Sequence, residues 1–350
     1  MRICFLVGDI KAQQPTYGGI HLAWAASRRG HDVRFVSIDD LSFLDDNNVL
    51  ATTVRARAGD YARPADYHRA LTSDDAARDE DALSGFDVVF LRYNPTREAG
   101  AHPTTPVIDF CWRLRLGGTL VVNDPEGVRR AGGSMYLADL PSEIRARTLV
   151  SRSPERLKEF LRALDGPAVL KPLAPGGTDE VFYLRRRQVK NLNQMITAIT
   201  KDGYAVAQEY VPEAERGEKR LMLLGGDPIR IGDRVAIYRR VPALRAPRDG
   251  AATVADGKAA RDKCQFGPAE ARVCEILRPK LLADGLYLVS VDLVGDKILE
   301  LNVFTPGGMH SMRELYSIDV ADQVIRALER RIRLRAAYRT TFDPEAADVV

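Results

Sequence analysis

The stretch from Val289 to Gly308 constrains this chain most, because it predicts a β-hairpin carrying three oxygen-bearing side chains. Two β-rich, alternating segments, VSVDLV and KILELNV, flank Gly295-Asp296, which is typical of a turn. Glu300 and Asn302 are two residues apart and therefore share one face of the second strand. Together with Asp292 they form a hard-cation site of the kind that holds Mg²⁺ against phosphates.

The turn sets a geometric condition on that site. With a strict two-residue loop Val294 faces Lys297, which puts Asp292 on the opposite face from Glu300. A shared metal therefore requires an odd-length loop or a β-bulge, such as a three-residue turn at Gly295. The alternative is an edge hairpin whose polar face is only hydrated.

Composition describes an ordinary globular protein. A length of 350 residues predicts two or three domains, and a net charge of +3 from 51 basic and 48 acidic residues gives no case for a nucleic-acid partner. The four cysteines lack CxxC spacing, which favours reduced thiols in a cytoplasmic protein over disulfides or zinc. We find no signal peptide and no apolar run of membrane-spanning length, so we expect no membrane partner.

Residues 1–123 alternate strand and helix patterns, which predicts an open parallel α/β domain. Gly30 is expected to end the first helix, and residues 41–85 are expected to be a variable excursion. The ligand edge of such a sheet is formed by the carboxyl ends of its strands. These ends lie near Gly8-Asp9, Arg92-Tyr93-Asn94 and Asn123.

After residue 124 the pattern becomes α+β. Ser153 and Pro154 predict the N-cap and first residue of a helix that ends at residue 164. Residues 242–265 read as a long loop, which is usually functional or disordered. Further helices are expected over 188–201, 266–284 and 319–336, and strands over 148–151, 168–172, 181–184, 204–211, 219–224 and 229–238.

Three further motifs precede the hairpin. Lys171 ends an apolar strand before Gly176-Gly177, which suits neutralisation of phosphates under a flexible loop. The strand Gln208-Glu209-Tyr210-Val211 turns into a proline linker whose backbone suits an adenine edge. Arg220, in Glu218-Lys219-Arg220, suits bidentate binding of an anion. Each motif alone is more typical of a solvated strand end or a surface residue.

In this order the motifs resemble the bacterial glutathione synthetase branch of the ATP-grasp ligases. The resembling stretches are KPL…GG, QEYVP, EKR and VDxxGDxxxExNV, and upstream FDVVFLRYNP and GTLVVNDP…R. The resemblance covers roughly residues 1–330. It implies a pre-ATP-grasp α/β domain followed by an ATP-grasp fold of two α+β subdomains with ATP between them. The divisions expected are 1–123, a central or lid subdomain at 124–202, a C-terminal subdomain with the metal site at 203–336, and a tail at 337–350.

The resemblance also implies a chemistry, in which ATP phosphorylates a carboxylate and an amine attacks the acylphosphate. ATP with Mg²⁺, or alternatively Mn²⁺, would serve small-molecule acid and amine substrates in a cytoplasmic homo-oligomer. Arg220 and Arg240 would hold the acylphosphate and substrate carboxylates. Asp292, Glu300 and Asn302 would bind the metal. The nucleotide would be held by Lys171, Gly176, Gly177, Gln208, Glu209, Tyr210, Val211, Glu218 and Arg129.

The chain departs from the family pattern at four places. Ser134 stands where the family has a second phosphate-binding lysine, a charge that Arg129 or Arg130 would have to replace. Thr178-Asp179-Glu180 follows the lid glycines, where the family tends to be small and glycine-rich. The substrate loop contains Arg248-Asp249-Gly250, and residues 305–310 replace the family's usual substrate-binding turn.

These departures leave three alternatives to a glutathione-like product. One is a ligase for a different amino-acid or peptide conjugate. Another is a nucleotide-binding regulator with impaired catalysis, which the serine at position 134 favours and the intact Asp292/Glu300/Asn302 set opposes. The third is a kinase-like relative that stops at phosphoryl transfer.

Overall fold

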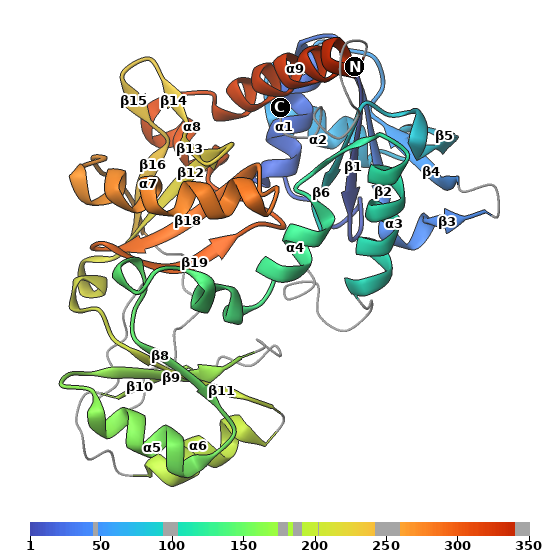
Figure 1. Cartoon of the computed structure of the whole chain (residues 1–350). Helices are drawn as coiled ribbons and strands as arrows, with labels where there is room; N and C mark the ends of the chain where they lie inside the picture. Colours follow the sequence, from blue (N-terminus) through green and yellow to red (C-terminus); the bar gives the residue numbers. More distant parts are fainter. Residues whose placement is uncertain are drawn as a thin grey trace.

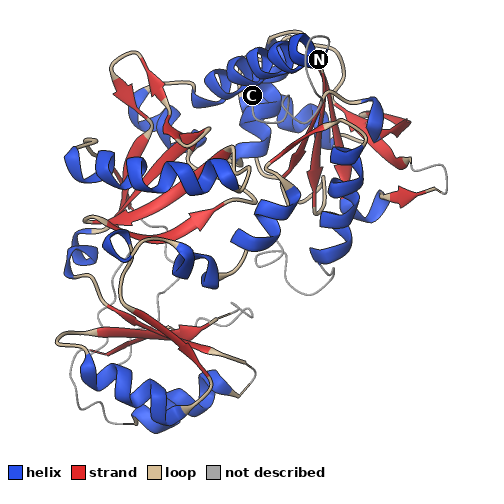
Figure 2. Cartoon of the chain, viewed as in Figure 1, coloured by secondary structure: helices blue, strands red, loops and turns tan. Residues whose placement is uncertain are grey.

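The computed structural model describes residues 1–44, 48–93, 104–173, 181–184, 191–201, 203–241 and 260–339. Within them the strands form three main sheets and one short hairpin, and helices lie against the sheets (Figure 1 and Figure 2). Across this described part of the chain, no helix combines the length and apolar character needed to span a membrane.

The first sheet has the strand order β3-β4-β2-β1-β6-β7, with β5 paired to β4. Its centre is the predicted β-α-β unit, in which β1 (Arg2–Val7) and β2 (Asp32–Ser37) pair in parallel and α1 (Gly18–Arg28) connects them. Gly30 has a φ of +78° and follows the helix end as expected. The parallel part continues through β6 (Val88–Leu91), α3 (Thr104–Leu116) and β7 (Leu120–Val122).

Residues 41–85 add an antiparallel wing to this sheet. Its acidic strand, residues 77–82, lacks alternating hydrophobic residues, so the sequence gives no strand signal there. Ion pairs hold this strand: Arg34 pairs with Asp79, and Arg2 pairs with Asp81 at 2.8 Å. The strands are β3 (Ser42–Phe43), β4 (Val49–Arg55) and β5 (Ala77–Ala82), and the helical segments η1 (Ile38–Asp40), α2 (Pro64–Thr72) and η2 (Leu83–Gly85) adjoin them.

The second sheet has the order β10-β9-β11-β8 and forms the lower lobe of Figure 1. Its strands are β8 (Thr148–Ser151), β9 (Ala168–Pro172), β10 (Phe182–Leu184) and β11 (Ala205–Glu209). The helices α5 (Pro154–Ala163) and α6 (Leu192–Thr200) cover one face, and α6 begins later than the expected residue 188. Ser153 caps α5 as predicted, because its Oγ accepts a hydrogen bond of 3.3 Å from the amide of Arg156.

The third sheet has the order β17-β16-β12-β18-β19, with β13 paired to β12. One face carries Leu221, Leu223 and Val291, which share a buried core with Leu277 of α7 (Pro268–Ala283). The strands are β12 (Glu218–Leu224), β13 (Asp227–Pro228), β16 (Ile237–Val241), β17 (Ala260–Lys263), β18 (Leu288–Val294) and β19 (Lys297–Asn302).

Two expectations for this region were wrong. The single strand over 229–238 is interrupted at Gly232, whose φ of +57° belongs to the turn of a separate hairpin, β14 (Arg230–Ile231) and β15 (Arg234–Val235). The expected loop over 242–265 includes β17, which pairs antiparallel with β16. Residues 242–259 of that loop lie outside the described residues.

The remaining segments connect the sheets. The chain passes from the first sheet through α4 (Pro125–Ala131), η3 (Ser134–Asp139) and η4 (Ser142–Ile144), and η5 (Pro212–Arg216) leads into β12. After β19 come α8 (Met309–Tyr316) and α9 (Val320–Arg339). Helix α9 returns to the first sheet, where Glu329 forms an ion pair of 2.7 Å with Arg29 beyond α1 (Figure 1).

Asn123 joins the first sheet to the third. Its amide nitrogen donates to the carbonyls of Leu288 and Val303 at 2.8 and 2.7 Å, and its oxygen accepts from the amide of Leu288 at 2.7 Å. The side chain is 2% exposed. The expectation that Asn123 belongs to a ligand edge was therefore wrong, because its hydrogen-bonding atoms are used between the two sheets.

Candidate functional site

A row of four side chains crosses the third sheet. The strand registers place Tyr238 opposite Arg220, Arg220 opposite Asp292, and Asp292 opposite Glu300. Directly opposed residues point to the same face of a sheet, so the row lies on the face away from α7. The sequence-predicted anion-binding arginine and two predicted metal ligands thus lie side by side.

A β-bulge makes this row possible. Val294 pairs with Lys297 and Leu293 with Ile298, but the next pair is Asp292 with Glu300. Leu299 is the extra residue, which shifts the register by one between Asp292 and Leu293. The sequence condition of a bulge or odd turn is confirmed, although the irregularity lies in β19 and not in the turn at Gly295.

Asp292 is the centre of a buried charge cluster. It is 0% exposed, and its Oδ1 accepts from Arg220 Nε at 2.7 Å while its Oδ2 accepts from Arg220 Nη2. Arg240 Nη1 lies 3.3 Å from Oδ2, and Asn302 Nδ2 lies 3.4 Å from the same atom. The bidentate pair gives this buried carboxylate a cationic partner in place of solvent.

Glu218 is the first residue of β12 and lies on the same face, opposite Arg240. Its Oε1 lies 3.1 Å from Arg240 Nη1. Burial raises the pKa of the Glu218 carboxyl to about 7, and the nearby charge of Asp292 adds to the rise. Arg240 and Arg220 oppose the shift without cancelling it. The cluster sets three carboxyl groups, those of Glu218, Asp292 and Glu300, beside two arginines, and such a set of oxygen ligands suits a cation.

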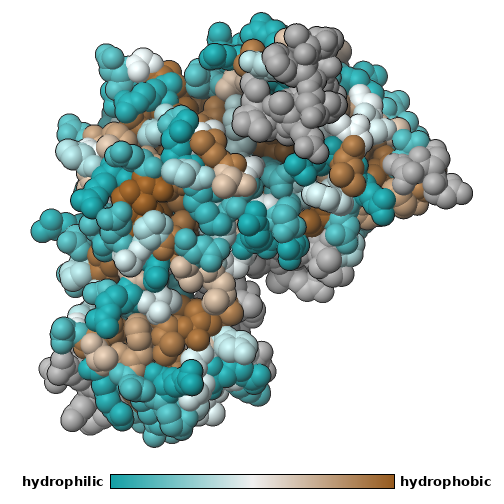
Figure 3. Space-filling view, viewed as in Figure 1, coloured by the Kyte–Doolittle hydropathy of each residue, from teal (hydrophilic) through white to brown (hydrophobic). Residues whose placement is uncertain are grey.

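Lys171 faces this cluster from the second sheet. It lies on β9 opposite Val206 of β11, on the face not covered by α5 and α6. Burial lowers the pKa of the Lys171 ammonium, and the charge of Glu300 raises it, which places the two groups within electrostatic reach. Figure 3 shows apolar surface over this second sheet, and Val169 and Val206 lie on the same face of the sheet as Lys171.

The predicted adenine-binding segment lies at the end of β11. Gln208 is 7% exposed and donates to Thr148 Oγ1 at 3.1 Å. The amides of Glu209 and Tyr210 donate to the carbonyls of Arg147 and Pro167 at 2.9 and 3.0 Å. These bonds fix the strand end, and Val211 begins the connection into η5.

Other predicted residues are not brought together with this cluster. Arg129 lies exposed on α4 in an ion pair of 2.6 Å with Glu126 of the same helix, and Arg130 pairs with Asp284 at 2.8 Å. Ser134 begins η3. Gly176, Gly177, Thr178-Asp179-Glu180 and Arg248-Asp249-Gly250 lie outside the described residues.

The donor set of the hairpin fits a hard cation. The side chain of Glu300 is exposed and forms no hydrogen bond or ion pair within the described ranges. Asn302 donates to Asp292 through Nδ2, which leaves its amide oxygen as a ligand, and Asp292 can contribute Oδ1, which accepts from Arg220 Nε alone among the described residues. Among the described residues no three His, Cys, Asp or Glu side chains group as metal ligands, so the amide of Asn302 is needed to complete the set.

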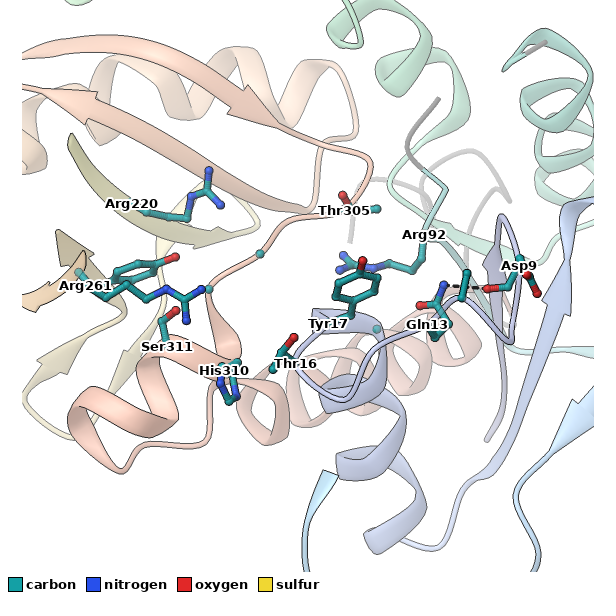
Figure 4. Close-up of a pocket in the computed structure, with 16 residues that line it drawn as sticks. Asp9, Gln13, Thr16, Tyr17, Arg92, Arg220, Arg261, Thr305, His310 and Ser311 are labelled. Carbon is teal, nitrogen blue, oxygen red and sulfur yellow. Dashed lines mark hydrogen bonds between the residues drawn. The ribbon is translucent and has the colours of Figure 1, made fainter. Parts of the chain in front are cut away.

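A cavity of about 360 Å³ lies between the first and third sheets beside this cluster (Figure 4). Arg220 and Tyr238 line one side, and Arg92 lies on the other, at the carboxyl end of β6. The edge expected at Asp9 and Arg92 is therefore part of a cavity. The remaining lining residues come from the loop after β1, the start of α1, β17, the segment before α8 and the first turn of α8.

Sequence reasoning missed most of these cavity residues. Gln13, Thr16 and Tyr17 lie in a loop without hydrophobic period, and His310 follows a turn that looked only like a departure from a known pattern. The glycine pair Gly18-Gly19 was the available signal, because two glycines at the start of a helix indicate a close approach by another group.

Comparison with known proteins gives matches along nearly the whole chain. Residues 1–129 match the family model described as "Prokaryotic glutathione synthetase, N-terminal domain", and residues 134–317 match "Prokaryotic glutathione synthetase, ATP-grasp domain". The chain is 30% identical over 337 residues to the glutathione synthetase of Synechococcus elongatus, covering 94% of this chain and 98% of that protein. It is 27% identical over 344 residues to the glutathione synthetase of a Nostoc species, covering 96% of this chain and 100% of that protein.

Solved structures agree on the fold. The D-cycloserine synthetase DcsG superposes with a TM-score of 0.62 at 18% identity, covering 94% of this chain and 99% of that one. The ATP-grasp ligase PsnB complexed with minimal precursor superposes with a TM-score of 0.58 at 16% identity, covering 94% of this chain and 99% of that one. The expected fold class, an open α/β domain followed by an ATP-grasp fold, is confirmed.

Proposed function

Because the chain belongs to the prokaryotic glutathione synthetase family, we propose that the cluster around Asp292 is the phosphate end of its ATP site. The protein is a glutathione synthetase-like ATP-grasp ligase that forms an amide bond at the expense of ATP. The observation that supports this proposal most directly is the row Arg220–Asp292–Glu300, which Lys171 faces from the second sheet.

The nucleotide fits between the second and third sheets. The open face of the second sheet offers apolar side chains at Val169 and Val206, and the strand end at Glu209 and Val211 offers backbone groups for an adenine edge. Lys171 neutralises phosphate charge from this side. Asp292, Glu300 and Asn302 would hold Mg²⁺ or Mn²⁺, which would supply positive charge beside the phosphates when bound.

The reaction divides into two displacements. A substrate carboxylate oxygen attacks the γ-phosphorus of ATP, the bond to the bridging oxygen breaks, and ADP leaves. The amine nitrogen then attacks the acyl carbon, phosphate leaves, and the nitrogen loses a proton. Arg220 and Arg240 hold the carboxylate and the transferred phosphoryl group in line, and no side-chain nucleophile is needed.

Arg220 is oriented for this role by Asp292. The carboxylate occupies Nε and Nη2 of the guanidinium, and Nη1 of this cavity-lining residue has no hydrogen-bond partner among the described residues. A bidentate pair fixes the plane of the guanidinium, so its free edge has a defined direction before substrate binds. Asp292 therefore serves both the metal and the positioning of Arg220.

Glutathione formation is the first candidate reaction, in which γ-glutamylcysteine supplies the carboxylate and glycine the amine. A different amino-acid or peptide conjugate is the second candidate. It is favoured by the segment Thr305 to His310, which lines the cavity and departs from the family's usual turn. Specificity resides in such cavity-lining segments and not in the nucleotide site.

The test is ADP release by the full chain with Mg²⁺ across a panel of acids and amines that includes γ-glutamylcysteine and glycine. We expect ADP only when an acid and its amine are both present. ADP with the acid alone, at the same rate, would favour a kinase-like reaction. ATP binding without turnover for every pair would contradict ligase activity and favour a regulatory protein.

A further inference from the structure

Arg92 is a buried cation that lacks a counter-ion within the described residues. It is 6% exposed, and its Nη2 donates to the carbonyl of Pro306 at 3.2 Å. Its Nε and Nη1 are buried and have no hydrogen-bond partner in the part of the chain that the structure describes. Burial lowers the pKa of Arg92 to about 10, which still leaves the guanidinium charged at neutral pH. An unpaired buried cation costs free energy unless an anion binds it.

The side chain lines the cavity beside the start of α1. Figure 4 shows the Arg92 guanidinium next to Tyr17, facing the same space as Arg220. A Cβ at Gly18 would lie 2.8 Å from Arg92 Nη2 and 3.1 Å from the carbonyl of Pro306. A Cβ at Gly19 would lie 3.8 Å from Arg92 Nε. The two glycines thus leave the room that the guanidinium occupies.

The first turn of α1 adds to the positive potential. Tyr17 at the N-cap supplies no capping side chain, and no acidic residue lies in the first turn. The first amides of a helix have no intrahelical acceptor, and the helix dipole favours an anion there. The described residues that line the cavity include Arg92, Arg220 and Arg261 and one carboxylate, that of Asp9, while Arg220 is already paired with Asp292.

We propose that Arg92 and the first turn of α1 form a subsite for a substrate carboxylate that is not consumed in the reaction. This inference rests on the proposed function, since the reacting carboxylate lies at the Arg220 end of the same cavity. The ligand is then an acid with a second carboxylate, or an amine that carries its own carboxylate. Arg92 is a specificity-determining residue in either case.

Binding to the full chain without ATP tests the subsite separately from catalysis. The probes for calorimetry are γ-glutamylcysteine, glutarate and glycine, each at up to millimolar concentrations. The variants are Arg92→Met, Arg92→Lys and Gly18→Ala, and their folding is verified by circular dichroism. Matched controls are Arg272→Met, an exposed arginine, and Gly166→Ala, where a Cβ would meet nothing within 4 Å.

We expect at least one probe to bind the wild-type chain and Arg92→Met to weaken it about 10- to 100-fold, the effect of losing a charged hydrogen-bond partner. Gly18→Ala should weaken binding as well, because it displaces the guanidinium, and Arg92→Lys should be intermediate. Both controls should bind as the wild-type chain does. Equal binding by wild type, Arg92→Met and Gly18→Ala, or no probe binding to the wild-type chain, would overturn the subsite.

Steady-state ADP release distinguishes the two carboxylate sources. A KM increase for the acid in Arg92→Lys, with kcat little changed, assigns the subsite to the acid, and the same change for the amine assigns it to the amine. Unchanged KM values for both contradict the proposal. Because the calorimetry contains no ATP, probe binding that depends on Arg92 supports the subsite even where no acid–amine pair gives turnover.

Discussion

Glu300 lies directly opposite Asp292 because Leu299 is bulged out of the β18–β19 ladder. Without this shift the two carboxylates would project from opposite faces of the hairpin. The bulge therefore turns a common β-hairpin into a site where Asp292, Glu300 and Asn302 share one side, as irregularities next to active sites often do.

Glu300→Gln should abolish Mg²⁺-dependent ADP release while the fold is retained. The amide removes the negative charge of Glu300, the exposed member of the proposed metal site, and surface substitutions change stability by no more than about 0.5 kcal/mol. The measurement is turnover against Mg²⁺ concentration, with Asp296→Asn at the tip of the same hairpin as the control. Wild-type turnover in the Gln variant would remove Glu300 from the site.

Arg220→Met should be strongly destabilising. It leaves Asp292, which is 0% exposed, without its bidentate partner, and breaking a buried pair from one side costs about 3–5 kcal/mol. Urea unfolding of Arg220→Met, Asp292→Asn and the double variant measures the coupling. We expect the double variant to be more stable than Arg220→Met alone. Additive losses would show that the two groups do not stabilise each other.

Glu218 should give the metal-free protein a pH-dependent stability. Burial and the charge of Asp292 raise the pKa of its carboxyl from 4.5 to about 7, so the folded protein binds a proton that the unfolded chain has released. The stabilisation is complete below pH 4.5 and is lost as the pH rises through about 7. Between these limits the free energy of unfolding should decrease as the pH rises. Glu218→Gln should remove this decrease, and Glu275→Gln, on the exposed surface of α7, should not. The same slope in all three proteins would contradict this assignment.

Lys171→Gln should weaken ATP binding without affecting the fold. Lys171 places a positive charge on the open face of the second sheet, and losing its proposed charged hydrogen bond to phosphate should lower the ATP affinity about 10- to 100-fold. Calorimetric titration with ATP measures this, and Lys201→Gln, exposed at the end of α6, is the control. ATP affinity equal to that of the wild-type chain would place the phosphates elsewhere.

The sequence predicted elements whose pattern carries a physical signal. Alternating apolar segments predicted β1, β2, β6 and β18, and Ser153 with Pro154 predicted the start of α5. The acidic strand β5 gave no such signal, because ion pairs and not apolar burial hold it. Asn123 looked like a strand-end ligand, and only the position of Leu288 across the sheet junction shows its structural role.

The candidate site was predictable as a set of residues but not as an arrangement. The spacing of Asp292, Glu300 and Asn302 indicated a metal site and even required a bulge. Its position in β19 depends on packing that the sequence does not reveal. The buried, unpaired state of Arg92 was also beyond sequence reasoning, since it arises from Gly18 and Pro306 meeting from distant parts of the chain.

Transfer of oxygen from the acid to phosphate tests the central claim most directly. The acid that supports turnover is labelled with oxygen-18 in its reacting carboxylate, and the phosphate released with ADP in the presence of Mg²⁺ and the amine is analysed by mass spectrometry. Attack of the carboxylate on the γ-phosphorus predicts one labelled oxygen in each phosphate formed. Amide product accompanied by unlabelled phosphate would contradict an acylphosphate and the function assigned to the Asp292 cluster.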